Sequence, residues 1–390
     1  MVISSISKLV AATVLCTGIL AGGFAQAAKA AEPKKAAPAP KIQLAILLDT
    51  SGSMNGLINQ ARTQLWEIVN QLATAKRDGV RPELNVSLYE YGKSSIPKSQ
   101  GFLRQIVPFT DDLDKISEEL FALKTNGGSE YCGQVIDSAT KGLKWSKSDK
   151  DLKLIFICGN EAFNQGPVNY KTACSAAIQK GITVNTIFCG PKAEGIRTFW
   201  QQGSQLADGS FTNINQNRQV AVVRTPFDQK LSALSGKVNR TYVAFGRADD
   251  RKRRVLRQLN QDKLAKKSAP AASAARASFK GKAAYNASAW DLVDALKKGK
   301  LKLKDIKNEL LPKEMQKMTL AQKEAFRKKK SAEREVIRAE INKLSSQRTK
   351  YIAELRKKNA EKSKTTALDE AVIKIIRTQA VKKRFSFDKK

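Results

Sequence analysis

The chain has 390 residues, 42% of them hydrophobic, and its 70 Lys and Arg against 36 Asp and Glu give a formal net charge of +34. This length predicts two or three domains, and the charge favours polyanionic partners such as anionic lipid, nucleic acid or acidic proteins. Histidine is absent from the sequence, which excludes Ser-His-Asp catalysis, Cys-His catalysis and zinc sites ligated by histidine. An enzyme with this composition would depend on carboxylates, lysine or a hard metal ion.

The first 27 residues have the pattern of a secretory signal peptide. Lys8 precedes a short apolar run from Leu9 to Leu20, and Ala25-Gln26-Ala27 fits the small-x-small cleavage rule. The run is too short to span a bilayer comfortably, and no later stretch is apolar enough. We therefore expect an exported protein, periplasmic or secreted, with no transmembrane span. Residues 28–40, rich in Ala, Pro and Lys, are expected to form a stiff linker.

Apolar strands and amphipathic helices alternate between residues 41 and 240. Residues 43–48 are nearly all apolar, as in a parallel strand covered on both faces, and residues 55–76 repeat apolar side chains at helical spacing. The alternation predicts an α/β fold, a doubly wound and mainly parallel sheet, in which ligands bind beyond the carboxyl ends of the strands. The other expected strands are 84–91, 104–109 at an edge, 152–158, 182–189 and 209–214, and the other expected helices are 112–123, 132–145, 171–181, 199–207 and 225–239.

The region after residue 240 is basic and carries most of the net charge. Residues 241–285 are expected to form a basic linker, flexible at the Ala/Ser-rich stretch 268–278. Residues 286–390 are predicted to be a basic helical region, with helices at 319–359 and 367–380. Apolar residues at three-four spacing in the first of these helices indicate a helical hairpin or a short coiled coil, through which the chain could oligomerise: Ile337, Ile341, Leu344, Tyr351 and Leu355.

The segment Asp49-Thr50-Ser51-Gly52-Ser53 follows the first predicted strand and opens the first predicted helix. One carboxylate and two hydroxyls on a tight loop are oxygen ligands of the kind that a Mg²⁺-like ion takes. The other interpretation is purely structural, with Asp49 capping the helix.

Asp-x-Ser-x-Ser after an apolar strand resembles the hallmark of von Willebrand factor type A (VWA) domains. The resemblance covers roughly residues 41–235. We therefore expect a VWA domain at 41–240. It implies a metal-ion-dependent adhesion site (MIDAS) that binds a protein partner with an acidic group through a divalent cation. The supporting segments are Asn126-Gly127-Gly128-Ser129, Leu154 to Cys158, and Gly181 to Ile187.

The rest of the expected site departs from the family's pattern. Ser129 stands where the family has a threonine, and this replacement keeps a side-chain hydroxyl at the position. The family's Thr-Asp-Gly is replaced by Cys158-Gly159-Asn160-Glu161, so the usual carboxylate is missing and Glu161 or Asn160 would have to compensate. Glu130 and Tyr131 lie beside Ser129 and either contact a ligand or have no role. The metal ligands that we predict are Asp49, Ser51, Ser53, Ser129 and Glu161.

Four cysteines remain after the predicted signal peptide. An even number in an exported protein permits disulfides, for which Cys174 with Cys189 is the favoured pair. Four buried thiols are the equally weighted alternative. The other two cysteines are Cys132 and Cys158.

The sequence is compatible with two classes of function and argues against a third. The favoured one is a binding protein whose VWA face captures a protein partner and whose basic tail contacts an anionic envelope surface or another subunit. The second is an assembly protein that oligomerises through its C-terminal helices. An enzyme is not expected, because no pair of a nucleophile and a base is recognisable. Specific nucleic-acid binding is not expected either, because aromatic residues are not interleaved with the basic clusters.

Overall fold

The computed structural model describes residues 39–215, 223–299, 301–359 and 368–387. The predicted signal peptide at 1–27 and nearly all of the predicted linker at 28–40 lie outside these residues. No helix in the described ranges is both long enough and apolar enough to cross a bilayer.

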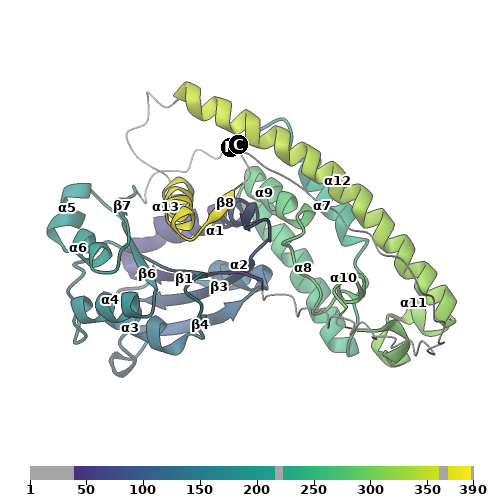
Figure 1. Ribbon diagram of the computed structural model, residues 1–390, viewed down its shortest axis with the longest axis horizontal. Coiled ribbons are helices and arrows are strands. Elements are labelled where there is room, and N and C mark those ends of the chain that lie inside the picture. Colours follow the sequence, from purple (N-terminus) through teal and green to yellow (C-terminus); the bar gives the residue numbers. More distant parts are fainter. Residues whose placement is uncertain (1–38, 216–222, 300, 360–367, 388–390) are drawn as a thin grey trace, which may run out of the picture. The chain divides into compact units, whose positions relative to one another are not determined.

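A six-stranded sheet forms the centre of the N-terminal half, with the strand order β4-β3-β1-β5-β6-β7 (Figure 1). All neighbouring strands are parallel except β3 and β4, which pair antiparallel at the edge. The predicted fold class and the edge position of the 104–109 strand are therefore confirmed. The strands are β1 (Lys41–Asp49), β3 (Glu83–Tyr91), β4 (Leu103–Thr110), β5 (Leu152–Gly159), β6 (Thr183–Phe188) and β7 (Phe211–Asn213).

Helices cover both faces of this sheet because its central strands are apolar on both sides. Leu44 and Leu48 of β1 belong to one core cluster, and Ala45 and Leu47 to the other. The first cluster is completed by α1 (Asn55–Leu72) and α2 (Leu113–Ala122), and the second by α3 (Cys132–Gly142), α4 (Tyr170–Gln179) and α6 (Trp200–Gln205). The shorter elements are α5 (Lys192–Arg197) and the 3-10 helices η1 (Gly52–Met54) and η2 (Lys98–Gln100).

The C-terminal half is helical. Its long helix predicted at 319–359 is confirmed as α12. Thr319 caps this helix: its hydroxyl accepts from the Gln322 backbone N–H, and the Gln322 side chain accepts from the Thr319 N–H. The helices are α7 (Asp228–Asn239), α8 (Ala248–Ser268), α9 (Pro270–Gly281), α10 (Leu292–Lys297), α11 (Lys313–Gln316), α12 (Leu320–Asn359), and the 3-10 helices η3 (Leu303–Asp305) and η4 (Asn308–Leu310).

The stretch expected to be flexible at 268–278 is instead a buried helix, α9, and the basic stretch before it is the helix α8. Small side chains explain the difference. Ala274, Ala275 and Ala277 are fully buried, so that α7, α1 and α12 approach the α9 backbone closely. Composition alone made this segment resemble a linker, whereas its contacts make it the centre of the helical half.

The apolar seam predicted on the long helix packs within the chain. Ile341 and Leu344 of α12 are buried against α7 and α9, and Ile337 packs against the same cluster. The ring of Tyr351 meets Phe227 edge to face, with 6.2 Å between centroids. In this chain the seam therefore forms an intramolecular core.

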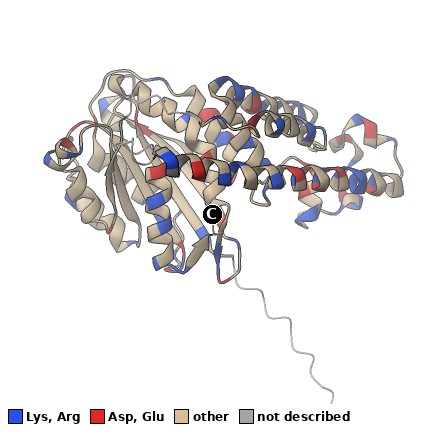
Figure 2. Ribbon diagram, turned by 90° about the horizontal axis from the view of Figure 1, so that it is seen from above, with Lys and Arg blue, Asp and Glu red and all other residues tan. Residues whose placement is uncertain are grey.

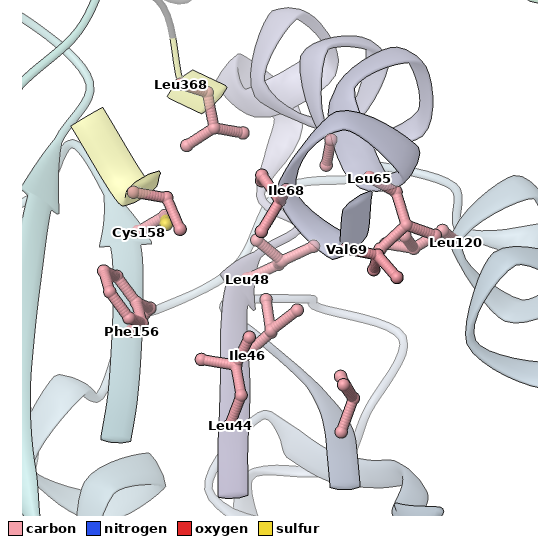
Figure 3. A pocket seen from close by; sticks show the side chains of 13 residues that line it. Leu44, Ile46, Leu48, Leu65, Ile68, Val69, Leu120, Phe156, Cys158 and Leu368 are labelled. Atoms are coloured by element: carbon pink, nitrogen blue, oxygen red, sulfur yellow. The ribbon is translucent and has the colours of Figure 1, made fainter. Parts of the chain in front are cut away.

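The end of the chain returns to the sheet. Helix α13 (Leu368–Lys382) packs along α1, and β8 (Phe385–Phe387) pairs antiparallel with β2 (Ala75–Arg77). Figure 3 shows Leu368 of α13 facing the same apolar space as Ile68 of α1 and Phe156 of β5. The cavity that remains there is small, about 40 Å³. Helix α13 thus closes the core between α1 and the sheet.

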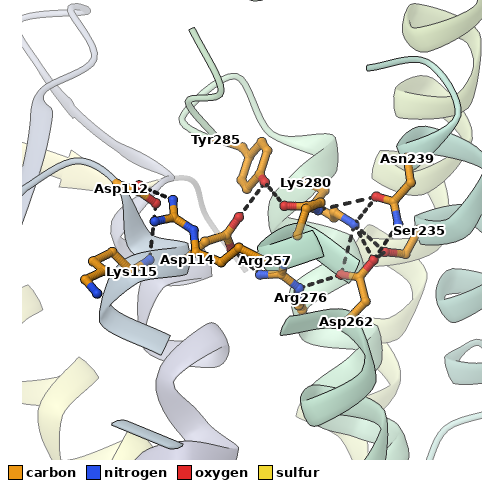
Figure 4. A network of polar contacts seen from close by, with 11 residues as sticks. Asp112, Asp114, Lys115, Ser235, Asn239, Arg257, Asp262, Arg276, Lys280 and Tyr285 are labelled. Atoms are coloured by element: carbon orange, nitrogen blue, oxygen red, sulfur yellow. Dashed lines mark hydrogen bonds and ion pairs between the residues drawn. The ribbon is translucent and has the colours of Figure 1, made fainter. Parts of the chain in front are cut away.

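Buried ion pairs join the helical half to the N-terminal half (Figure 4). Arg276 of α9 bonds Asp114 of α2, and its Nε donates to Asp262 of α8 at 2.6 Å. Lys280, which is fully buried, donates to Asp262 at 2.8 Å, and the Tyr285 hydroxyl donates to Asp114 at 2.8 Å. Elements from both halves thus share one polar network inside a common core.

Candidate functional site

The loop after β1 leaves one carboxylate oxygen free. Asp49 is fully buried at the carboxyl end of β1. Its Oδ1 accepts a hydrogen bond from the Ser51 backbone N–H at 2.7 Å, whereas its Oδ2 is buried without a hydrogen-bond partner among the described residues. The hydroxyl oxygens of Ser51 and Ser53 lie 3.4 Å apart on the same loop. A buried polar atom without a partner is costly, so this oxygen is a candidate ligand atom.

Two glycines let three loops meet around Asp49. Gly92 follows β3 with a φ of +77°, and a Cβ there would lie 2.8 Å from Asp49 Oδ1 and 2.9 Å from Glu130 Cγ. A Cβ on Gly128 would overlap the carbonyl oxygen of Gly92. The backbone N–H of Asn126 donates to the carbonyl of Thr50 at 3.1 Å. The segment 126–130 is therefore held directly against the loop after β1.

Glu130 is the carboxylate that the second loop brings to the site. It is 6% exposed, and the nearby Ser51 side chain acts to lower its pKa. Burial raises the pKa of Glu130 to about 7, and repulsion from Glu161 adds to the rise. Sequence reasoning placed Glu130 only at the rim, and its one signal was its position between Ser129 and the start of α3.

The electrostatics of Asp49 reflect the same neighbours. Burial raises the pKa of Asp49 to about 7. Hydrogen bonds from Ser51 oppose this rise, and the Glu130 and Glu161 carboxylates add to it. These side chains therefore repel one another at neutral pH unless a proton or a cation separates them.

The other predicted ligands take more peripheral positions. The side-chain amide of Asn160 donates to the Ser53 hydroxyl at 3.2 Å. Glu161 is exposed and acts on Asp49 and Glu130 through its charge. Ser129 is half-buried, and no hydrogen bond joins it to Asp49, Ser51 or Ser53 in the described structure.

The site thus consists of a loop with one aspartate and two serines at the end of the first strand of a parallel sheet, faced by a second loop. Residues 43–202 match the von Willebrand factor type A domain. No curated protein matches the chain.

Solved structures with this fold cover less than half of the chain. BatB from Bacteroides thetaiotaomicron is 16% identical, with 44% of this chain and 90% of that one covered and a TM-score of 0.33. The SpRpn10 VWA domain is 16% identical, with 46% and 91% covered and a TM-score of 0.34. The pilus adhesin SpaC from Lactobacillus rhamnosus GG is 13% identical, with 45% and 28% covered and a TM-score of 0.33. At such identities the likeness concerns the fold alone.

Aromatic side chains fill the space beside Gly159, where the resemblance to VWA domains implied a carboxylate. A Cβ on Gly159 would lie 2.5 Å from the Tyr91 hydroxyl oxygen and 3.1 Å from the Trp200 ring. The same Cβ would lie 3.1 Å from Asp49 Oδ2, so a side chain here would point at the free oxygen. Tyr91 is fixed there by donating to the Cys158 carbonyl at 3.0 Å.

The donors present fit a hard cation of the kind that VWA domains often bind. The unpartnered Asp49 oxygen, the paired serine hydroxyls and the buried Glu130 offer oxygen atoms only. The described residues contain no group of three or more His, Cys, Asp and Glu side chains that could hold an ion. An ion here would consequently depend on the serine hydroxyls as well as on carboxylates.

The four cysteines of the described structure are free and buried, including the Cys174 and Cys189 pair favoured for a bridge. Burial raises the pKa of the Cys174 thiol to about 12 and those of Cys158, Cys132 and Cys189 well above the usual value. Thiols held protonated are poor nucleophiles. In this structure they act as small apolar core residues.

Proposed function

We propose that this chain is an exported binding protein whose VWA domain captures an acidic group of a protein partner through a divalent cation, Mg²⁺ or a similar ion. The family match supports a protein-binding or adhesion role. The observation that carries the proposal is the Asp49 Oδ2 atom, buried without a partner at the carboxyl end of β1. A ligand at this oxygen would satisfy it.

Asp49, Ser51 and Ser53 would hold the cation from the first loop, and Glu130 would supply the second carboxylate in place of the one missing at Gly159. When bound, the cation supplies positive charge and an open coordination position for an incoming carboxylate. The Ser51 side chain acts to lower the pKa of Glu130, which supports their acting together. Ser129 and Glu161 are assigned to the rim, where they would meet the partner.

The proposal includes export, periplasmic or secreted, because of the signal-peptide pattern at 1–27. It also includes contact of the basic C-terminal helices with an anionic envelope surface. No catalytic role is assigned, since the sequence has no histidine and the cysteine thiols are buried.

The first test is a calorimetric titration of Mg²⁺ into the chain from Ala28 onward, which retains the compact unit at 39–390. Asp49→Ala and Ser51→Ala should abolish the binding heat. Glu130→Gln should weaken binding at least about tenfold, because the charge of the ligands sets the affinity. Glu161→Gln should change binding less.

Asp137→Asn is the matched control, since among the described residues the ion pair of Asp137 is with Lys141 on α3. Capture of partners from the native envelope, with and without chelator, then follows with the same variants. Unchanged Mg²⁺ binding in Asp49→Ala would refute the cation mechanism.

Assembly through the C-terminal helices was the alternative. Its expected surface, the seam of α12, is packed on α7 and α9 within the chain, so we do not propose it.

A further inference from the structure

Helix α8 presents one face of exposed aliphatic and cationic side chains. Val255, Leu256 and Leu259 are 39%, 48% and 47% exposed. At 100° per residue these side chains and the surrounding cations project from the same side of the helix. We call this side the α8 outer face, and it consists of Lys252, Arg253, Val255, Leu256, Leu259, Lys263, Lys266 and Lys267, all exposed.

The opposite side of α8 holds the helix in place. Arg254 and Arg257 both bond Asp112 at the start of α2. Asp262 accepts from Arg276 and Lys280 of α9. Gln261 is buried on this side as well. Ion pairs therefore hold α8 in place, and its outer face is already formed before any partner binds.

Most cations of the outer face form no ion pair in the part of the chain that the structure describes. No ion pair in the described structure involves Lys252, Lys263, Lys266 or Lys267, whereas Arg253 pairs with Asp250. Lys297 of α10, by contrast, pairs with Glu335. Figure 2 shows Lys and Arg spread along the helices while the strands are mostly free of them. The unpaired cluster on α8 is therefore available to an anionic partner.

The aliphatic side chains decide which anionic partner fits. A nucleic-acid backbone would neutralise the lysines but leave Val255, Leu256 and Leu259 in water, and the face has no aromatic ring for base stacking. A helix with cations around an apolar strip matches a lipid surface, where headgroups meet the cations and the strip enters the acyl boundary. We propose that the α8 outer face binds the surface of an anionic lipid membrane.

This inference deepens one part of the proposed function, the contact with an anionic surface, and gives it a location. It does not involve the Asp49 site. Mg²⁺ titration and vesicle binding are separate measurements, so failure of one is distinguishable from failure of the other.

The test uses the chain from Ala28 onward, without the apolar signal segment, and vesicles of phosphatidylcholine with or without phosphatidylglycerol. We expect binding only to the vesicles that contain phosphatidylglycerol, weakened by salt. The triple variant Lys263→Gln/Lys266→Gln/Lys267→Gln should bind about 100-fold more weakly, since each cation near an anionic surface contributes about a factor of five. Leu256→Ser/Leu259→Ser should weaken binding about tenfold with the charge unchanged.

The matched control, Lys328→Gln/Lys329→Gln/Lys343→Gln, removes three exposed lysines of α12 that also lack ion pairs in the described structure, and should retain nearly full binding. The proposal is overturned if the wild type ignores anionic vesicles or if the control loses as much as the α8 variant. It is also overturned if duplex DNA binds as tightly as the vesicles and the Leu256/Leu259 variant loses nothing, which would assign the face to a polyanion.

Discussion

At the scale of single residues, Asp49 combines burial with a charge that its surroundings do not neutralise. Its pKa of about 7 is raised by burial first and then by Glu130 and Glu161. A group whose folded pKa exceeds its unfolded value stabilises the fold most fully below the unfolded pKa, and this contribution is lost as pH rises through the folded pKa. Ionised Asp49 thus reduces stability at neutral and higher pH, as is common for a group kept for binding.

Asp49→Asn should therefore increase the free energy of unfolding at pH 8 in the absence of divalent ions, by on the order of a few kcal/mol. The gain should shrink as pH falls from about 7 to about 4, where the wild-type carboxyl is protonated in both states. Urea unfolding at several pH values checks this, with Asp137→Asn as a control. If the effect of Asp49→Asn on the free energy of unfolding did not change with pH, ionisation of Asp49 would not be its cause.

Gly159 provides a second test at this scale. Gly159→Ala should destabilise the fold by about 1–3 kcal/mol, because the new methyl group would press on the Tyr91 hydroxyl. Tyr91→Phe in the same background should recover part of the loss by removing the clashing oxygen. A double-mutant cycle by urea unfolding measures this coupling, and purely additive effects would contradict the contact.

The motif predicted the first loop of the site but not the second. Asp49, Ser51 and Ser53 are close in sequence, so their proximity follows from one tight turn. Glu130 could not be assigned, because its contact with Ser51 depends on the packing allowed by Gly92 and Gly128. Tertiary contacts of this kind leave no periodic signal in a single sequence.

At the scale of elements, hydrophobic pattern predicted almost every strand and helix of the sheet region, and failed where packing decides. The Ala/Ser-rich stretch was interpreted as a linker, yet α9 is among the most buried helices. The amphipathic helix at 367–380 was predicted as a helix, but its place beside α1 was not. The periodicity of apolar residues predicts that one face of a helix is buried. It does not predict which element that face packs against.

Helix α13 lies outside the matched segment 43–202, yet its apolar side chains belong to the core of the sheet. Ile376→Ala, at a site only 2% exposed, should cost about 2–5 kcal/mol in the free energy of unfolding. Val381→Ala on the same helix, at a site 66% exposed, should stay within about 0.5 kcal/mol of wild type. Chemical denaturation followed by tryptophan fluorescence measures both. Equal effects would mean that α13 is not part of this core.

At the scale of the whole molecule, the sheet and the helical half are joined by buried charges. Arg348 of α12 bonds Glu67 of α1 at 2.6 Å, and Arg276 of α9 bonds Asp114 of α2. Residues 39–390 cluster as one unit. The composition predicted that the C-terminal half is basic, but not that some of its arginines are buried between the two halves. Pairing of this kind depends on acidic residues far away in the sequence.

Asp262 is the anion on which two buried cations of this network depend. Burial alone would raise its pKa, but attraction from Lys280 and Arg276 outweighs that effect and lowers the pKa well below its usual value. A carboxyl with a lowered folded pKa stabilises the fold above its unfolded pKa, and the stabilisation is lost as pH falls below about 4. Asp262→Asn should therefore cost about 3–5 kcal/mol at pH 7, because Arg276 keeps its charge without this partner and buried Lys280 loses the attraction that opposes the lowering of its pKa.

The variant should also lose less stability than the wild type when the pH is lowered, since the titrating group is gone. Far-UV circular dichroism during urea unfolding at pH 7 and pH 3 gives both quantities. Asp305→Asn, a substitution at an exposed carboxylate, is the control and should change neither. If the network joins the two halves as the contacts indicate, Asp262→Asn should shift the unfolding of α-helix signal and of tryptophan fluorescence together. A shift in one signal alone would mean that the halves unfold separately.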